Sequence, residues 1–184
     1  GEFGYGRMAE PVEIFADIET RLNSAITTKL RGKRVLVTSG PTEEPIDPVR
    51  YISNRSSGLQ GVAIAEALVR AGADVIFVTG PATHSMPCGV EVVPVQTASD
   101  MLKNVKMGGP FDVVICVAAV SDWQMMNIAS GKLKKDPLLK TLQLELVRTP
   151  DILEQISKFN PRPKLIIGFA AETDQIENNA LIKL

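Results

Sequence analysis

The feature that most constrains the fold of this chain is a regular alternation of short apolar runs with stretches of helical composition. The apolar runs are rich in valine and isoleucine, and glycine, serine, threonine and proline stand at the ends of the helical stretches. Such alternation is typical of a doubly wound α/β fold with a mostly parallel, Rossmann-like sheet. We expect strands at residues 35–38, 74–79, 91–95, 112–117 and 164–169, and helices at 58–71, 99–107 and 149–160, with another from 173 onward.

Two segments depart from this alternation. Residues 141–147 (TLQLELV) place leucines on one side and polar residues on the other, a period typical of an antiparallel or edge element. Before the first strand, Pro11 stands at the first turn of a helix that we predict to run to about residue 27. We interpret residues 1–30 as a linker or lead-in helix rather than as a second functional domain.

The composition fits one domain and disfavours several classes of function. The 184 residues are 45% apolar, which suffices for a core at this length, and 20 basic side chains nearly balance 21 acidic ones. We therefore expect no general attraction to nucleic acid or to an anionic membrane. The apolar runs are too short to span a bilayer. Two cysteines without a disulfide pattern indicate a reducing, cytoplasmic setting, and a single histidine argues against a zinc site.

We expect the binding site at the carboxyl ends of the strands, where ligands lie in open α/β sheets. The candidate loops follow Thr38, Thr79, Val117 and Phe169. The first of them, residues 39–61 (SGPTEEPIDPVRYISNRSSGLQG), is much longer than the usual connection of roughly two to six residues. Long ordered connections are often functional, so we interpret this stretch as a binding loop.

The end of this loop suits a phosphate group. Ser56, Ser57 and Gly58 open the following helix, whose free N–H groups and dipole favour an anion, and Gly61 permits close approach. The alternative is that a serine simply caps the helix. A dinucleotide fingerprint is not supported, because Gly40 is followed by proline and the second strand ends without a carboxylate, and no Gly-Lys-Ser/Thr sequence occurs.

Arg50 and Asn54 stand four residues apart in the same loop. An arginine and an asparagine could neutralise and orient an acyl or phosphoryl group. Taken alone, such loop residues are more often turn formers or solvated charges. Their neighbours in the loop favour the functional interpretation.

Two later loops share one design. AAVSDWQ (118–124) and GFAAET (168–173) both combine small residues with an acid at a strand end. Small residues let a flat ring approach the main chain, while Asp122 could hold a ribose hydroxyl or a cation and Trp123 could line a pocket. The alternative is an aspartate that ends a strand beside a half-buried tryptophan. Together the loops favour a nucleotide, and the basic run GKLKK (131–135) is placed to reach its phosphates.

Two other reactive side chains are not expected to take part in catalysis. We interpret His84 as a loop residue rather than a base, and Cys116 as part of a buried strand rather than a nucleophile. No Ser/His/Asp or Cys/His arrangement is readable, which disfavours covalent catalysis by the protein.

The motifs carry a resemblance to a known family. SGPTEEPIDPVRYISNRSSG, CVAAVSDW, GKLKK, TPDIL and GFAAET, in this order and spacing, are similar to the phosphopantothenate–cysteine ligase half of the bacterial bifunctional coenzyme A biosynthesis protein. The resemblance covers residues 33–173 and implies that residues 31–184 form a nucleotide-binding ligase domain. The leading GEFGYGRMAEP resembles the tail of the flavin-dependent decarboxylase half, so residues 1–30 would be its remnant and no flavin would bind this chain.

The resemblance implies a two-step reaction that uses CTP as co-substrate and Mg²⁺ or another divalent cation. The carboxylate of 4'-phosphopantothenate attacks the α-phosphate of CTP, giving an acyl cytidylate and pyrophosphate, and the amine of cysteine then displaces CMP. Such a reaction needs positioning and charge neutralisation more than a protein nucleophile, in agreement with the residues present. A homodimer and a decarboxylase domain in the parent protein are also implied.

The resemblance assigns roles by motif position. Asn54 would orient the acyl group and stabilise the oxyanion of amide formation, and Arg50 would support its loop or the pantothenate side. Lys132 would meet the triphosphate, and Asp122 the ribose or the metal. The residues expected at the nucleotide are Ser39, Gly40, Ser56, Ser57, Gly58, Ala118, Asp122, Lys132, Phe169, Ala170, Ala171 and Glu172.

The family continues beyond GFAAET with another strand and a lysine-bearing flap, so we expect a sheet that is incomplete on its C-terminal side. Two alternatives to an active ligase remain. One is a CTP-binding but inactive fragment. The other is an NAD(P)-linked oxidoreductase, which Gly80-Pro81 at the end of the second strand disfavours.

Overall fold

The computed structural model of the chain describes residues 12, 28–82, 85–135, 138, 140–171, 174–175, 178 and 181. Its centre is a parallel sheet with the strand order β5-β4-β1-β6-β9. The strands are β1 (Arg34–Ser39), β4 (Asp74–Thr79), β5 (Glu91–Pro94), β6 (Val113–Cys116) and β9 (Leu165–Gly168). All of them lie where the sequence predicts strands, which confirms the mostly parallel sheet.

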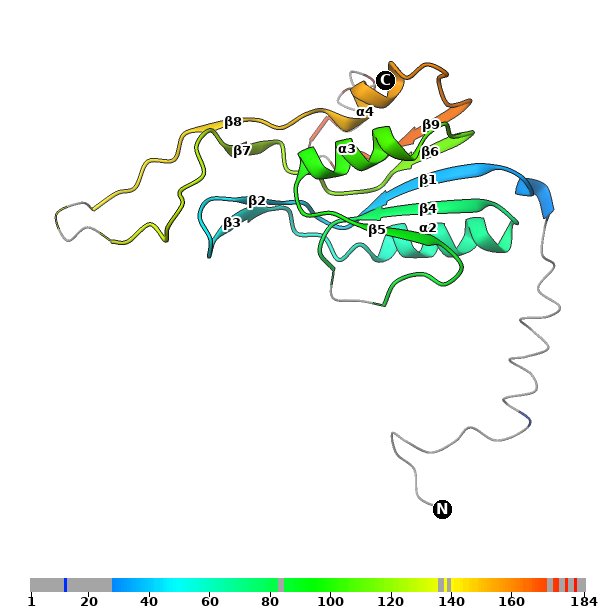
Figure 1. Cartoon of the computed structure of the whole chain (residues 1–184), viewed down its shortest axis with the longest axis horizontal. Helices are drawn as coiled ribbons and strands as arrows, with labels where there is room; N and C mark the ends of the chain where they lie inside the picture. Colours follow the sequence, from blue (N-terminus) through cyan, green and yellow to red (C-terminus); the bar gives the residue numbers. More distant parts are fainter. Residues whose placement is uncertain are drawn as a thin grey trace.

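Helices cover both faces of this sheet (Figure 1). α2 (Leu59–Arg70) packs on one face, and α3 (Ala98–Gly108) and α4 (Ile152–Ser157) pack on the other. Successive side chains of a strand point to opposite faces, so β1 contributes to two apolar cores. Val35 and Val37 lie with α2, whereas Leu36 lies with α3 and α4. A short 3-10 turn, η1 (Thr28–Leu30), leads into β1.

Two antiparallel ribbons extend beyond the carboxyl ends of the parallel strands (Figure 1). β2 (Glu43–Pro45) pairs with β3 (Tyr51–Ser53), and β7 (Trp123–Met125) pairs with β8 (Leu146–Arg148). The β2–β3 hairpin lies within the loop that follows β1, and β7 begins just after the loop that follows β6. The sequence did not predict β2, β3 or β7, because three-residue runs are too short to show a period.

The alternating segment 141–147 enters an antiparallel pairing only at its end, in β8. Its partner is β7, not an edge strand of the main sheet. The leucine side of this segment is not buried: Leu142, Leu144 and Leu146 are 61%, 39% and 37% exposed. The reason is that this ribbon projects away from the body of the protein, where no described core lies against it (Figure 1).

α4 begins later than predicted. Thr149 does not cap the helix, because its N–H and hydroxyl donate to the main-chain carbonyls of Asp122 and Ser121. Asp151 is the N-cap instead, and its carboxylate accepts the N–H of Glu154 at 2.9 Å. The helices predicted at 11–27 and from 173 onward, like His84, lie outside the described residues apart from isolated positions.

Candidate functional site

The loops after β1 and β6 run side by side beyond the sheet. The N–H of Ala119 donates to the carbonyl of Gly40 at 2.9 Å, and the N–H of Thr42 donates to the carbonyl of Ala119 at 3.4 Å. Pro41 and Ala119 form a parallel bridge that continues the pairing of β1 with β6. The two loops therefore make one surface at the carboxyl edge of the sheet, as the sequence predicts.

The loop after β4 closes the other side of this edge. The N–H of Gly80 donates to the carbonyl of Ser39 at 3.0 Å. A Cβ on Gly80 would lie 1.6 Å from the carbonyl oxygen of Pro41, and Gly40 takes a positive φ of 70° beside Gly80. Main chain fills the space between the ends of β1 and β4, so room for a ligand lies toward β6 and β9.

The loop after β9 joins this β6 side. Phe169 donates its N–H to the carbonyl of Cys116 at 3.2 Å, and its residue is 48% exposed. Ala170 and Ala171 are also exposed, while Ala118 is partly buried. These residues leave main chain accessible at the edge where a base is predicted to bind. Glu172 lies outside the described residues.

Ser39 is buried under the start of α2. Its hydroxyl donates to the carbonyl of Gly58 at 3.1 Å. A Cβ on Gly61 would lie 2.2 Å from that hydroxyl oxygen, so the missing side chain of Gly61 gives room to Ser39. Ser39 thus fixes the position of the helix start, and its own contact with a nucleotide stays a prediction.

The start of α2 is open to an anion. Its N-cap is Gly58, which has a left-handed φ of 74° and no side chain to cap the helix. The hydroxyls of Ser56 and Ser57 accept the N–H groups of Gly58 and Leu59 at 3.3 and 3.4 Å, which places them at the first turn. No acidic residue lies in that turn, whereas α3 and α4 each begin with one. The helix dipole and free N–H groups of α2 therefore suit a phosphate.

Asn54 ties the β2–β3 hairpin to the loop after β6. Its amide nitrogen donates to the carbonyls of Val120 at 2.9 Å and Ala119 at 3.3 Å. Two neighbouring acceptors fix the orientation of the amide, since only its NH₂ end can face them. Asn54 is exposed, and the atom that it offers to a ligand in this arrangement is the acceptor Oδ1.

Asp122 is exposed at the end of the loop after β6. Its main-chain carbonyl accepts the N–H of Thr149 at 3.0 Å, which attaches this loop to the segment before α4. Among the described residues, no group of three or more His, Cys, Asp or Glu side chains could hold a metal ion. A single carboxylate still fits Mg²⁺, which commonly binds one or two carboxylates together with water and phosphate oxygens.

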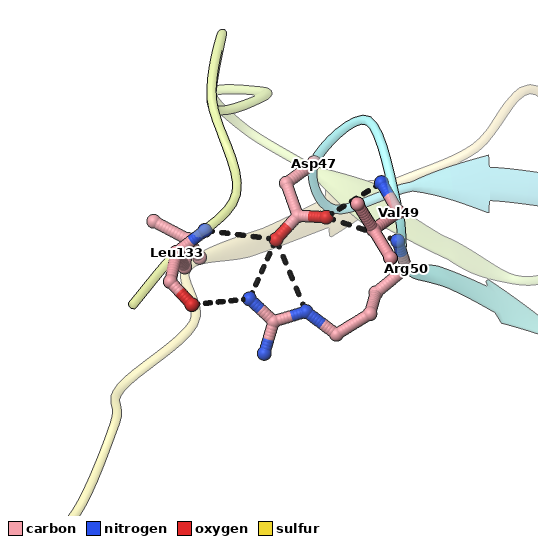
Figure 2. Close-up of polar contacts among 4 residues, drawn as sticks. All are labelled: Asp47, Val49, Arg50 and Leu133. Atoms are coloured by element: carbon pink, nitrogen blue, oxygen red, sulfur yellow. Dashed lines mark hydrogen bonds and ion pairs between the residues drawn. The ribbon is translucent and has the colours of Figure 1, made fainter. Parts of the chain in front are cut away.

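Arg50 lies in the turn of the β2–β3 hairpin, where it contacts Asp47 and Leu133 (Figure 2). Its guanidinium donates to the Asp47 carboxylate from Nε at 3.0 Å and from Nη2. Nη2 also donates to the carbonyl of Leu133 at 2.8 Å. The Arg50 side chain holds the pKa of Asp47 well below its usual range against an opposing effect of burial, and the N–H groups of Leu133, Val49 and Arg50 contribute to the lowering.

The three residues expected to be catalytic, Asn54, Arg50 and Lys132, do not all lie at the same end of the β2–β3 hairpin. Arg50 lies at the turn end of the hairpin and contacts the main chain of Leu133, the residue that directly follows Lys132. Asn54 lies at the sheet end, with β3 between it and Arg50. Asp47 is not among the site residues predicted from the sequence, although an aspartate before a proline is a signal for a side chain that binds the N–H groups of a turn.

Asn54 and Asp122 are exposed on the loops at the carboxyl edge. Two hollows in the described surface instead flank α3, with volumes of about 430 and 730 Å³. The larger is bounded by α3 and by Arg148, Thr149 and Pro150. Neither hollow is lined by Asn54 or Asp122, so a ligand at the carboxyl edge would bind on exposed loops.

Cys116 lies at the end of β6, and burial raises the pKa of its thiol to about 11, although a hydrogen bond with Thr38 acts in the opposite direction. A thiol that stays protonated at neutral pH is a poor nucleophile, so this agrees with the interpretation of Cys116 as a core residue.

Within the described part of the chain, no helix has the length and apolar character needed to cross a membrane.

The chain resembles known proteins in both sequence and fold. The family model for the DNA/pantothenate metabolism flavoprotein C-terminal domain matches residues 30–184. The whole chain is 42% identical to 46% of the coenzyme A biosynthesis bifunctional protein CoaBC of Vibrio cholerae serotype O1, and 41% identical to 45% of CoaBC from Bacillus subtilis. It spans about half the length of these curated relatives. The crystal structure of the C-terminal domain of a CoaBC matches with a TM-score of 0.74 and 43% identity, over 85% of this chain and 74% of that one.

Proposed function

This chain belongs to the family of DNA/pantothenate metabolism flavoprotein C-terminal domains, and we propose that it is the CTP-dependent ligase that joins 4'-phosphopantothenate to cysteine. The observation that carries the proposal is the open start of α2, with Ser56 and Ser57 at its first turn, beside the loops after β1 and β6. This arrangement suits a nucleotide whose phosphates lie on the helix start. The names of relatives that are 42% and 41% identical to this chain support a place in coenzyme A biosynthesis.

In the first step, the carboxylate of 4'-phosphopantothenate attacks the α-phosphorus of CTP, and pyrophosphate leaves as the P–O bond breaks. Ser56, Ser57 and the N–H groups that follow Gly58 would bind the phosphates, and Lys132 would neutralise part of their charge. Asp122 would hold Mg²⁺, which supplies further charge neutralisation when bound. The protein therefore contributes position and charge rather than a nucleophile.

The base and ribose would lie toward β6 and β9. Ala118, Phe169, Ala170 and Ala171 offer main-chain groups there, since the edge between β1 and β4 is filled by Gly40 and its neighbours. Recognition of cytosine through main chain would explain why no conspicuous base-reading side chain occurs in these loops. The preference for CTP over other nucleotides is part of the proposal.

In the second step, the amine of cysteine attacks the acyl carbon, and CMP leaves. The N–H groups of Asn54 are engaged by Ala119 and Val120, so Asn54 offers its Oδ1 atom to the reaction. This acceptor suits an N–H of the attacking amine, whereas stabilisation of the oxyanion would require release of a carbonyl. We therefore assign amine orientation to Asn54 ahead of the oxyanion role that the resemblance implies.

The proposal includes a homodimer and, in the parent protein, a flavin-dependent decarboxylase domain, with a cytoplasmic setting. Exposed apolar side chains on the ribbon that carries β7 and β8 support association with a second copy. They are Met126, Ile128, Leu142, Leu144 and Leu146, which are between 37% and 61% exposed. The dimer would be tested by the oligomeric state of the chain in solution.

A pyrophosphate-release assay with 4'-phosphopantothenate, CTP and Mg²⁺, with and without cysteine, tests the ligase. We expect pyrophosphate in both cases and the amide product only with cysteine. A CTP-binding but inactive fragment would bind CTP and release no pyrophosphate.

Calorimetric titration with CTP, ATP and NAD tests which nucleotide the chain prefers, and a lack of preference for CTP would contradict the proposal. The NAD(P)-linked alternative has no structural support at the end of β4, where Gly80 packs on Pro41.

A further inference from the structure

The Asp47 carboxylate makes more hydrogen bonds than its turn requires. Oδ1 accepts the N–H groups of Val49 and Arg50 at 2.8 and 2.9 Å, which closes the turn between β2 and β3. Oδ2 accepts the guanidinium of Arg50 and, at 3.0 Å, the N–H of Leu133, which lies 86 positions further along the chain. The side chain of Asp47 is 0% exposed. One oxygen thus serves the turn, and the other serves a distant segment.

Both main-chain polar groups of Leu133 are bound by this pair of side chains. Asp47 accepts its N–H, and Arg50 donates to its carbonyl (Figure 2). Residues 131–135 belong to no described strand or helix, so Asp47 and Arg50 provide the hydrogen bonds that a neighbouring strand would otherwise supply. The N–H of Ala129 adds a bond to the carbonyl of Ile46 at 3.1 Å. The hairpin turn therefore holds the chain at Leu133 and at Ala129, just before this segment.

We propose that Asp47 and Arg50 are positioning residues that fix the lysine-bearing segment 131–135 for contact with the phosphates of the substrate. The identity of that ligand rests on the proposed function. Lys132 and Lys134 flank Leu133, and both are exposed. Holding the main chain of Leu133 fixes the root of each lysine and leaves both ammonium groups accessible to an anion. The position of these lysines matters, because an ammonium group neutralises a phosphate effectively only when the two lie within a few ångström of each other.

The same hairpin links the lysines to Asn54. β3 connects Arg50 at the turn to Asn54 at the sheet, and Asn54 is in turn held by the carbonyls of Ala119 and Val120. The ribbon is therefore fixed at both ends, by an ion pair at one and by an amide at the other. Loss of the Asp47–Arg50 pair would release the lysines while the sheet and the Asn54 end stay in place.

Limited trypsin digestion of the full chain measures this directly, because trypsin cuts after lysine and arginine. We expect Arg50→Gln and Asp47→Asn to raise the initial rate of cleavage after Lys132 and Lys134 by about tenfold, the scale of losing a charge-assisted hydrogen bond. Cleavage after Lys103 in α3, and after Arg70 at the end of α2, should stay unchanged. The products are identified by mass spectrometry.

The matched control is Lys33→Gln. Lys33 and Arg50 have equally exposed side chains, 42%, and Lys33 pairs with Asp112 at the opposite edge of the sheet. This variant should leave cleavage after Lys132 unchanged. Equal cleavage after Lys132 in Arg50→Gln and in the unaltered chain would overturn the proposal, and so would a uniform rise at all sites, which reports general unfolding.

Titration of the same variants with CTP separates this inference from the proposed function. We expect Arg50→Gln to weaken CTP binding by about tenfold, as Lys132→Ala should, while Lys33→Gln has no effect. Selective cleavage with unchanged CTP affinity would establish that the pair holds the segment and would overturn a role of these lysines in nucleotide binding. Failure of all variants and the unaltered chain to bind CTP would overturn the proposed function, while the digestion would still decide whether the segment is held.

Discussion

The two ends of the β2–β3 hairpin are held by different kinds of interaction. At the sheet end, Asn54 and Thr42 make neutral hydrogen bonds with residues 119–121. At the turn end, the Asp47–Arg50 ion pair binds the main chain of Leu133. Neutral bonds to main chain give a position that does not change with pH or salt, whereas an ion pair can be weakened by both. Under the proposed function, the sheet end would serve acyl transfer and the turn end would hold the lysines of residues 131–135 near the phosphates.

The largest expected effect comes from Asn54→Ala at the sheet end. Pyrophosphate release should continue, while formation of the amide product falls by about a hundredfold, the scale of losing one oriented polar group at a reacting centre. Separate assays of pyrophosphate and amide product measure the two steps. Asn104→Ala is the control, because Asn104 also donates to a main-chain carbonyl, that of Asp100 in α3, but lies away from the site. Product at the normal rate in Asn54→Ala would refute the assignment.

Lys132→Ala tests the turn end of the hairpin through the first step of the reaction, the release of pyrophosphate. We expect the rate of pyrophosphate release to fall by about tenfold, since one charge is removed from the triphosphate site. Lys103→Ala, which removes an exposed lysine from α3, should leave the rate unchanged. If Lys132→Ala slowed only amide formation, the division of the hairpin into two functional ends would be wrong.

Thr42→Val removes a hydrogen bond at the sheet end of the hairpin and leaves every proposed ligand contact in place. Thr42 and Ser121 are 0% and 3% exposed, and the Thr42 hydroxyl accepts the N–H of Ser121 at 3.0 Å. Leaving that buried N–H unpaired should lower the free energy of unfolding by about 1 to 3 kcal/mol, as measured by urea denaturation. Ser53→Ala removes an exposed hydroxyl from the same end and should cost less. An equal decrease in the free energy of unfolding in the two variants would show that burial of the hydroxyl does not decide the size of the effect.

The main sheet could be predicted from sequence because its strands are apolar runs that need no partner to be recognised. Residues 35–37 and 75–79 are buried by helices on both faces, and this composition is visible in the chain itself. The carboxyl-edge location of the loops follows from the same topology. The position of Asn54, Ser56 and Ser57 near this edge could therefore be predicted, whereas their roles stay predictions.

The interior of the long loop could not be predicted, because its order depends on contacts between distant segments. Glu44 is 1% exposed, and its carboxylate accepts the N–H of Ala98 at 2.8 Å, at the start of α3. Asp47 is bound by Leu133 in the same way. In sequence both acids read as solvated loop residues. Main-chain partners such as the Ala98 and Leu133 N–H groups leave no signature in residue type.

The pH dependence of stability gives the smallest effect, because Arg50 is 42% exposed and solvent screens its ion pair. The pKa of Asp47 is lowered in the folded chain, so its contribution to stability is complete above the ordinary carboxyl pKa, about 4, and is lost as the pH falls further. Asp47→Asn should thus be less stable than the unaltered chain at pH 7, and the difference should shrink progressively as the pH falls below about 4.

Urea unfolding at a series of pH values measures this convergence. The pKa of Asp112 is also lowered, chiefly by the N–H of Arg34 and by Lys33, but this contribution is present in both chains and cancels in their difference. Thr42→Val at the sheet end should instead differ from the unaltered chain by the same amount at every pH, since its lost hydrogen bond carries no charge. A constant difference for Asp47→Asn as well would mean that the ion pair does not distinguish the two ends of the hairpin.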